Sequence, residues 1–246
     1  MHRPFKQIVP GASTAILFIH GILGSPDHFS PLLPLVPPYY SVYNLLLDGH
    51  GSSVQDFSRS SMKTWQAQVL DAARDLAESH GRVCIVAHSM GTLLALGAVA
   101  EQIHIDELFL LALPIRLKLR FRLLSNIVKV FFNRISPEDD GAIASRNACS
   151  ITLSKNLFLY LGWIPRYLEL FRKISRTRKL LHRIQTPTTV FQSAMDEMVS
   201  PTTVPYLKQK STFTVHLLKG SEHYRYSQED LSAIQKSFQE LLDRNQ

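Results

Sequence analysis

The chain of 246 residues is 45% apolar, which is typical of a folded globular protein and excludes an intrinsically disordered one. Its formal net charge is +7, and its two cysteines, Cys84 and Cys149, are too few for a disulfide framework. No long apolar stretch predicts a signal peptide or a membrane span, and the expected compartment is the cytoplasm.

The first part of the chain alternates between apolar runs and glycine-containing loops. Residues 14–19 are typical of a buried strand, and the loop His20-Gly21-Ile22-Leu23-Gly24 follows. Ser25 precedes a proline and an acid, which is the pattern of a helix start. A second strand is predicted over 41–47 and ends at Asp48-Gly49-His50-Gly51. We expect His20 to shape its loop through hydrogen bonds and His50 to have a structural role.

The pentapeptide Ala87-His88-Ser89-Met90-Gly91 carries the most information. It lies between the apolar run 83–86, which follows an amphipathic helix predicted over 61–80, and a helical pattern over 92–100. A serine at such a strand-to-helix turn has an exposed hydroxyl, which is the arrangement of a nucleophile elbow. Serine needs a base to take its proton, so the motif predicts an acid and a histidine after later strands.

The segment 114–183, which we call the cap, interrupts the alternation after a strand predicted over 108–113. It is predicted to hold three or four helices, one beginning near Ser136-Pro137-Glu138-Asp139 and the last opening at Pro165. An insertion at this point of the chain would lie over the carboxyl ends of the strands, where the serine is expected. The cap is interpreted as a subdomain of a single fold.

The positive charge is concentrated in the cap, which holds 15 Lys and Arg but 4 Asp and Glu, a net charge of +11. The rest of the chain has a net charge of −4. Apolar and basic residues alternate from Ile115 to Arg122. The twofold alternation is typical of a strand, whereas the position of this stretch within the cap favours a helix or an extended arm. Four interpretations stay open: a solvated face, an anionic membrane surface, an acidic acyl carrier protein, or an anionic substrate. No nucleic-acid-binding motif is present, and nucleic acid is not expected as a partner.

The alternation resumes after residue 183, with strands predicted over 188–194 and 213–218 and helices over 201–209 and 227–243. Alternating strands and helices predict a mostly parallel sheet covered on both faces. Asp196 follows the first of these strands and His223 follows the last, in the chain order Ser89, Asp196, His223. The competing residues are Glu197 for the acid, and His216, inside a strand, and His182, in the cap, for the base. His88 is predicted to pack near the site, not to act as the base.

These motifs together resemble α/β-hydrolases of the carboxylesterase and monoacylglycerol-lipase type. The resemblance rests on the loop at 20–24, the turn at 48–51, the serine elbow, the Asp196 loop and His223, with Ala87 departing from the usual glycine. It implies a hydrolase core over 1–113 and 184–246 and a helical cap over 114–183. It also implies a catalytic Ser89-Asp196-His223 triad and an oxyanion hole made by the backbone N–H groups of Ile22 and Met90.

The predicted function is hydrolysis of carboxylic esters with small to medium acyl chains, through an acyl-enzyme on Ser89. One alternative is an esterase or thioesterase that acts on acyl chains held by an acidic carrier protein docked on the basic cap, and another is a non-catalytic ligand receptor. Dehalogenation is disfavoured because, in the resembling families, dehalogenases use a carboxylate at the elbow, where this chain has Ser89. No metal-ligand spacing, cofactor motif or phosphate loop is present, and no metal or cofactor is expected. The residues placed in the acyl pocket by position are Ile22, Leu23, Met90, Phe121, Phe131, Phe158 and Trp163.

Overall fold

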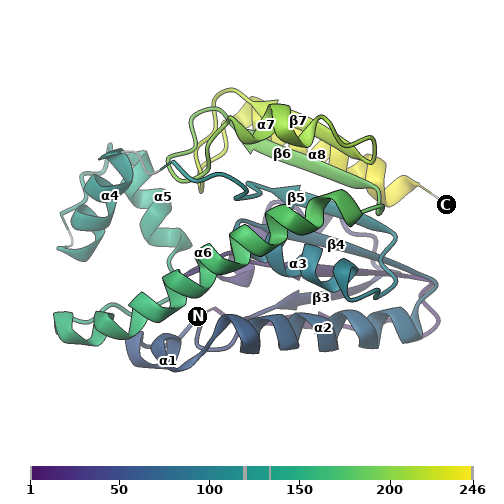
Figure 1. The fold of residues 1–246 in the computed structure, drawn as a ribbon, viewed down its shortest axis with the longest axis horizontal. Helices are drawn as coiled ribbons and strands as arrows, with labels where there is room; N and C mark the ends of the chain where they lie inside the picture. Colours follow the sequence, from purple (N-terminus) through teal and green to yellow (C-terminus); the bar gives the residue numbers. More distant parts are fainter. Residues whose placement is uncertain (1, 119–120, 133, 245–246) are drawn as a thin grey trace.

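A computed structural model describes residues 2–118, 121–132 and 134–244. Its centre is a seven-stranded sheet in the order β1-β3-β2-β4-β5-β6-β7, parallel except for β1, which pairs antiparallel with β3 (Figure 1). The mostly parallel α/β sheet predicted from the sequence is confirmed. The strands are β1 (Phe5–Gln7), β2 (Thr14–Ile19), β3 (Ser41–Leu45), β4 (Arg82–His88), β5 (Glu107–Leu111), β6 (Thr188–Ser193) and β7 (Phe213–Leu218).

Both faces of the sheet are covered, because every residue of β2, β4, β5 and β6 is buried. In β2, Leu17 and Ile19 point to one hydrophobic cluster while Ile16 and Phe18 point to another, as the twofold period of a strand requires. The first cluster includes the buried faces of α2 (Met62–Ser79), α3 (Met90–Ala100) and α6 (Trp163–Leu180). The second includes η1 (Pro26–Phe29) and α8 (Gln228–Asp243).

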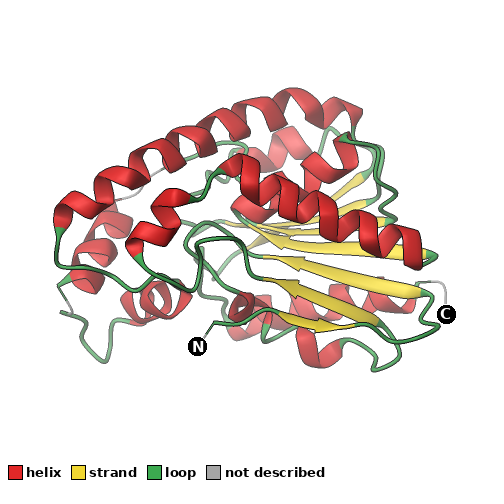
Figure 2. Cartoon of the chain, turned by 90° about the horizontal axis from the view of Figure 1, so that it is seen from below, coloured by secondary structure: helices red, strands yellow, loops and turns green. Residues whose placement is uncertain are grey.

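The cap helices lie between β5 and β6 in the chain. They are α4 (Phe121–Phe131), α5 (Asp140–Ala148), η3 (Leu157–Gly162), α6 and η4 (Leu181–Arg183). Figure 2 shows the parallel strands pointing toward the side of the molecule where these helices gather. The carboxyl ends of the strands therefore face the cap, and loops that follow the strands meet beneath it.

Several predicted helix starts are displaced in the structure. The helix expected from Ser25 is the single 3-10 turn η1, which Ser25 caps. The helix expected over 201–209 is the shorter α7 (Thr203–Leu207), because residues 201 and 202 form a turn. Asp139, not Ser136, caps α5, through a bond from the backbone N–H of Ala142 to its carboxylate. Pro165 lies in the first turn of α6, two residues after its start.

Three short elements were absent from the sequence prediction: β1, η2 (Leu33–Leu35) and α1 (Val54–Arg59). Helix α1 carries a capping box, in which Ser53 accepts the backbone N–H of Asp56 and the Asp56 carboxylate accepts the N–H of Ser53. The alternating segment at 115–122 is extended up to Lys118, whose N–H donates to Met198 O, and helical from Phe121. Leu119 and Arg120 lie outside the described residues. None of the described helices is both long and apolar enough to cross a membrane.

Candidate active site

Ser89 stands at the turn between β4 and α3 with a strained backbone, φ 51° and ψ −122°. A non-glycine residue in such a conformation costs about 1–3 kcal/mol and persists only where the surroundings enforce it. Gly91 makes the turn possible, since a Cβ at that position would lie 2.2 Å from Ile19 O and 2.7 Å from His20 O. The helix can therefore approach β2 only with glycine there, and the approach fixes Ser89 at the carboxyl edge of the sheet.

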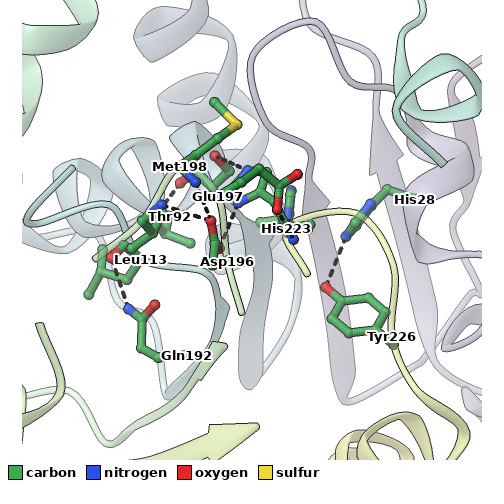
Figure 3. Close-up of polar contacts among 12 residues, drawn as sticks. His28, Thr92, Leu113, Gln192, Asp196, Glu197, Met198, His223 and Tyr226 are labelled. Carbon is green, nitrogen blue, oxygen red and sulfur yellow. Dashed lines mark hydrogen bonds and ion pairs between the residues drawn. The ribbon is translucent and has the colours of Figure 1, made fainter. Parts of the chain in front are cut away.

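The structure brings Ser89, His223 and Asp196 together from three separate loops. The His223 Nε2 atom lies 3.1 Å from Ser89 Oγ, and its Nδ1 atom lies 2.8 Å from Asp196 Oδ2. The other carboxylate oxygen, Asp196 Oδ1, accepts the backbone N–H groups of Met198 and Val199, each at 2.7 Å (Figure 3). The carboxylate is thus held by its own loop, and its position makes His223 Nδ1 the protonated nitrogen and His223 Nε2 the acceptor.

Glu197 and His88 hold the backbone of His223. The buried Glu197 carboxylate accepts the backbone N–H of His223 at 3.1 Å, and His88 Nε2 donates to His223 O at 3.1 Å. Glu197, the competing candidate for the acid, therefore contacts the histidine main chain, while Asp196 contacts the ring. This role of Glu197 was not predicted from the sequence, where the only available signal was its adjacency to Asp196. Of the other candidate bases, His216 stacks on Phe191 and His182 lies in η4, an exposed part of the cap.

The charged forms of His223 and Asp196 stabilise each other. Burial lowers the pKa of His223, but the Asp196 charge and hydrogen bond, with the Glu197 charge, outweigh burial and raise it above its ordinary value of 6.5. Burial raises the pKa of Asp196, but His223 and the two backbone N–H groups outweigh it and lower that pKa below its ordinary value. Asp196 therefore stays ionised and stabilises the protonated imidazole.

Two buried residues that line the cavity beside Ser89, Ile22 and Met90, have backbone N–H groups without an acceptor among the described residues. Within the part of the chain that the structure describes, no acceptor takes the backbone N–H of Ile22 or of Met90. The loop of Ile22 is fixed by His20, whose Nδ1 donates to Gly21 O at 2.9 Å while its Nε2 accepts the N–H of Leu47 at 3.0 Å. From the cap side, Ser150 N–H donates to Leu23 O at 2.7 Å. Unpaired donors held this firmly can bind an oxyanion without rearrangement.

A cavity of about 540 Å³ opens beside Ser89 and is lined almost entirely by apolar side chains. Leu23, Phe131 and Trp163, which were expected there by position, line it. Phe121 and Phe158 do not line it; their side chains are 83% and 81% exposed, so their placement in the pocket was wrong. Further lining residues that the sequence analysis did not name include Leu117, Leu153, Leu157, Tyr160, Tyr167, Leu170, Phe171, Ile174 and Val199.

A second cavity of about 340 Å³ adjoins the first and is more polar. It is lined by His28 and His88, whose rings lie 3.8 Å apart, and it shares Ala148 and Tyr224 with the apolar cavity. His28 also faces the Tyr226 hydroxyl, with 3.3 Å between His28 Nε2 and the oxygen (Figure 3). Tyr224 lines both cavities, and its hydroxyl makes no hydrogen bond to any described residue. Among the described residues, no cluster of three His, Cys, Asp or Glu side chains has the arrangement of a metal site.

Comparison with known proteins places this geometry in context. A model of the alpha/beta hydrolase family matches residues 16–233. One of the metagenome-derived lipolytic enzymes LipS and LipT is similar with a TM-score of 0.73 at 19% identity, over 99% of this chain and 98% of its own. Monoglyceride lipase from Saccharomyces cerevisiae follows with a TM-score of 0.64 at 14% identity, over 98% and 90% of the two chains. The haloalkane dehalogenase DbeA from Bradyrhizobium elkani USDA94 has a TM-score of 0.61 at 18% identity, over 98% and 97%. The search of curated proteins found no matching sequence.

Proposed function

Because this chain belongs to the alpha/beta hydrolase family, we propose that it hydrolyses carboxylic esters through an acyl-enzyme on Ser89. The observation that carries the proposal is the hydrogen-bonded series Ser89-His223-Asp196 beside two unpaired buried N–H groups. This arrangement supplies a nucleophile, a base, an orienting acid and oxyanion donors within one site.

In the first half of the reaction, Ser89 Oγ attacks the ester carbonyl carbon and its proton passes to His223 Nε2. The N–H groups of Ile22 and Met90 bind the resulting oxyanion; one such donor is worth about 10²–10³ in rate. The bond to the leaving oxygen then breaks, and His223 gives its proton to the departing alcohol. Asp196 stabilises the imidazolium throughout and does not take the proton.

In the second half, a water molecule attacks the acyl carbon. His223 takes one proton of the water and passes it to Ser89 Oγ as the carboxylic acid leaves. One ester and one water thus give one acid and one alcohol, and the enzyme returns to its starting state. Ester chemistry is favoured over dehalogenation because the elbow residue is Ser89, whose hydroxyl, activated by His223, forms an acyl ester with a carbonyl carbon.

The apolar cavity supports acyl groups as substrates. Its volume of about 540 Å³ and apolar walls fit a hydrocarbon chain extending from Ser89 under the cap. Two proteins to which the chain is similar are a lipolytic enzyme and a monoglyceride lipase. We therefore propose small to medium acyl chains, with the polar second cavity on the leaving-group side.

Hydrolysis of p-nitrophenyl esters from acetate to palmitate, by the wild type and by Ser89→Ala, tests the proposal. We expect a maximum at one chain length and loss of turnover in the variant, with unchanged circular dichroism. Activity retained by pure Ser89→Ala would refute the serine mechanism. If a fluorophosphonate probe labels Ser89 but no ester of the series is cleaved, the nucleophile is competent and the acyl-chain range proposed here is wrong.

A further inference from the structure

The exposed apolar side chains of this protein are concentrated on the cap. Fifteen large apolar side chains of the described residues are exposed, and ten of them lie between residues 114 and 183. The cap is 70 residues long, so its share is far above what its length predicts. These ten are Phe121, Val128, Phe132, Leu153, Leu157, Phe158, Leu161, Ile164, Leu168 and Phe171.

Helix α6 presents these side chains as a stripe on one face. Ile164, Leu168 and Phe171 follow one another at helical spacing and are 47–55% exposed. A neighbouring face of the same helix packs inward, because Leu170 and Ile174 are buried in the core. The stripe is therefore additional to the face that folding requires.

Helix α4 repeats the pattern on the other side of the cavity. Phe121, Val128 and Phe132 share one face and are 83%, 55% and 63% exposed. Val130 and Phe131 of this segment line the apolar cavity. Both helices that flank the cavity thus turn one apolar face inward and leave another in water.

The cavity opens into this apolar surface. Leu153, Leu157 and Phe171 line the cavity and are also 37%, 65% and 47% exposed. In Figure 1, α4 and the first half of α6 project beyond the sheet at the same end of the molecule. An acyl chain that leaves a lipid layer at this end would pass from one apolar surface to the next without crossing water.

The charge of the same surface selects the kind of partner. Arg172, Arg176 and Lys179 are exposed on α6 beyond the stripe, and none of them is ion-paired with a described carboxylate. An acidic carrier protein would match these charges but would leave the phenylalanine and leucine stripes in water. An anionic bilayer matches both, because basic side chains bind its head groups while apolar ones enter the interface.

We propose that the cap docks on an anionic lipid bilayer, with the stripes of α4 and α6 immersed and the basic residues of α6 at the head groups. Docking would place the mouth of the cavity at the membrane surface. The proposal needs no assumption about the reaction at Ser89, so vesicle binding and ester hydrolysis test separate statements.

Sedimentation of the full chain with vesicles of phosphatidylcholine, with or without phosphatidylglycerol, tests the docking. We expect binding to the anionic vesicles, weakened by salt, and little binding to the neutral ones. Removing three stripe residues together should weaken binding about tenfold or more, through the triple variant Phe132→Ser, Ile164→Ser and Leu168→Ser. The matched control removes three residues of 46–47% exposure outside the cap: Phe5→Ser, Ile8→Ser and Leu217→Ser.

Charge reversal on α6 provides a second test of docking by the same vesicle-binding experiment. Reversing three basic residues should weaken binding by about two orders of magnitude, through Arg172→Glu, Arg176→Glu and Lys179→Glu. The control reverses exposed lysines of the core: Lys63→Glu, Lys208→Glu and Lys236→Glu. Thermal unfolding and circular dichroism verify that each variant is folded.

Two results would overturn the proposal. One is no binding of the wild type to anionic vesicles, whether or not an acidic acyl carrier protein is bound instead. The other is equal loss of binding in the stripe variant and its control, which would mean that the apolar side chains of the cap have no particular part in it.

Discussion

Acid should destabilise this protein through its buried neutral histidines, and His50 allows the effect to be calculated. The His50 side chain is 4% exposed and packs edge-on against the rings of His20, Phe57 and Trp65. Its Nδ1 donates to Asp48 O at 3.2 Å, but its Nε2 has no partner among the described residues. Burial, only partly offset by backbone hydrogen bonds, lowers the pKa of His50 from 6.5 to about 4.

The direction of the stability change with pH depends on which state of the chain binds the proton. Between pH 6.5 and about 4, the unfolded chain protonates this residue and the folded chain does not. Stability is therefore complete above pH 6.5 and is lost as the pH falls through this window. At pH 5 the loss from His50 is about 2 kcal/mol, a large part of the 5–15 kcal/mol that stabilises a typical domain. Burial also lowers the pKa of His20 and of His88, so both add losses of the same sign.

The variant His50→Phe isolates this contribution. Asp48 O keeps a donor after the change, because the Trp65 indole N–H also donates to it at 2.8 Å. Urea unfolding at pH 7 and pH 5 gives the acid-induced loss for each protein, and packing costs common to both pH values cancel. We expect the loss to be about 2 kcal/mol smaller in His50→Phe than in the wild type, and unchanged in the exposed control His182→Phe. Equal losses in all three proteins would refute the reasoning.

Two further predictions concern the elbow and the base. Gly91→Ala should lower the free energy of unfolding by about 3 kcal/mol or more, because the new Cβ would meet the backbone oxygen of Ile19. The control Gly81→Ala should be tolerated, because the atom nearest to its Cβ lies 3.8 Å away. Similar urea midpoints for the two variants would contradict this prediction. Glu197→Gln keeps an acceptor for the His223 N–H but removes a charge that raises the pKa of His223. Since the base must be neutral, activity falls as the pH drops below that pKa, and the acid limb of kcat/KM should move to lower pH in the variant; an unmoved limb would exclude the electrostatic role.

The sequence was most informative where one residue type alone satisfies the geometry. The strand-turn-helix pattern around Ser89 predicted the elbow because only a small residue at position 91 allows the close approach to β2. The carboxyl ends of parallel strands share one edge, so a chain order of serine, acid and histidine was enough to predict that these side chains meet.

The sequence was least informative where contacts are made between distant segments. The Glu197 carboxylate reaches the main chain of His223, a bond for which a sequence pattern carries no signal. Phe121 and Phe158 were assigned to the pocket by their position in the cap, yet both side chains are exposed to water. In each case the partner, and not the residue type, determines the position.

The separation of charge between the cap and the rest of the chain also makes the molecule an electric dipole. A cap of net charge +11 and a remainder of net charge −4 form a dipole whose positive end carries the mouth of the cavity. Near an anionic surface such a dipole turns the cap toward the surface before contact, and the core is repelled. Because orientation precedes contact, the charge would act on the rate of docking, while the apolar stripes would act on the residence time. Salt should therefore slow association of the wild type far more than it speeds dissociation, a difference that stopped-flow mixing with anionic vesicles would measure.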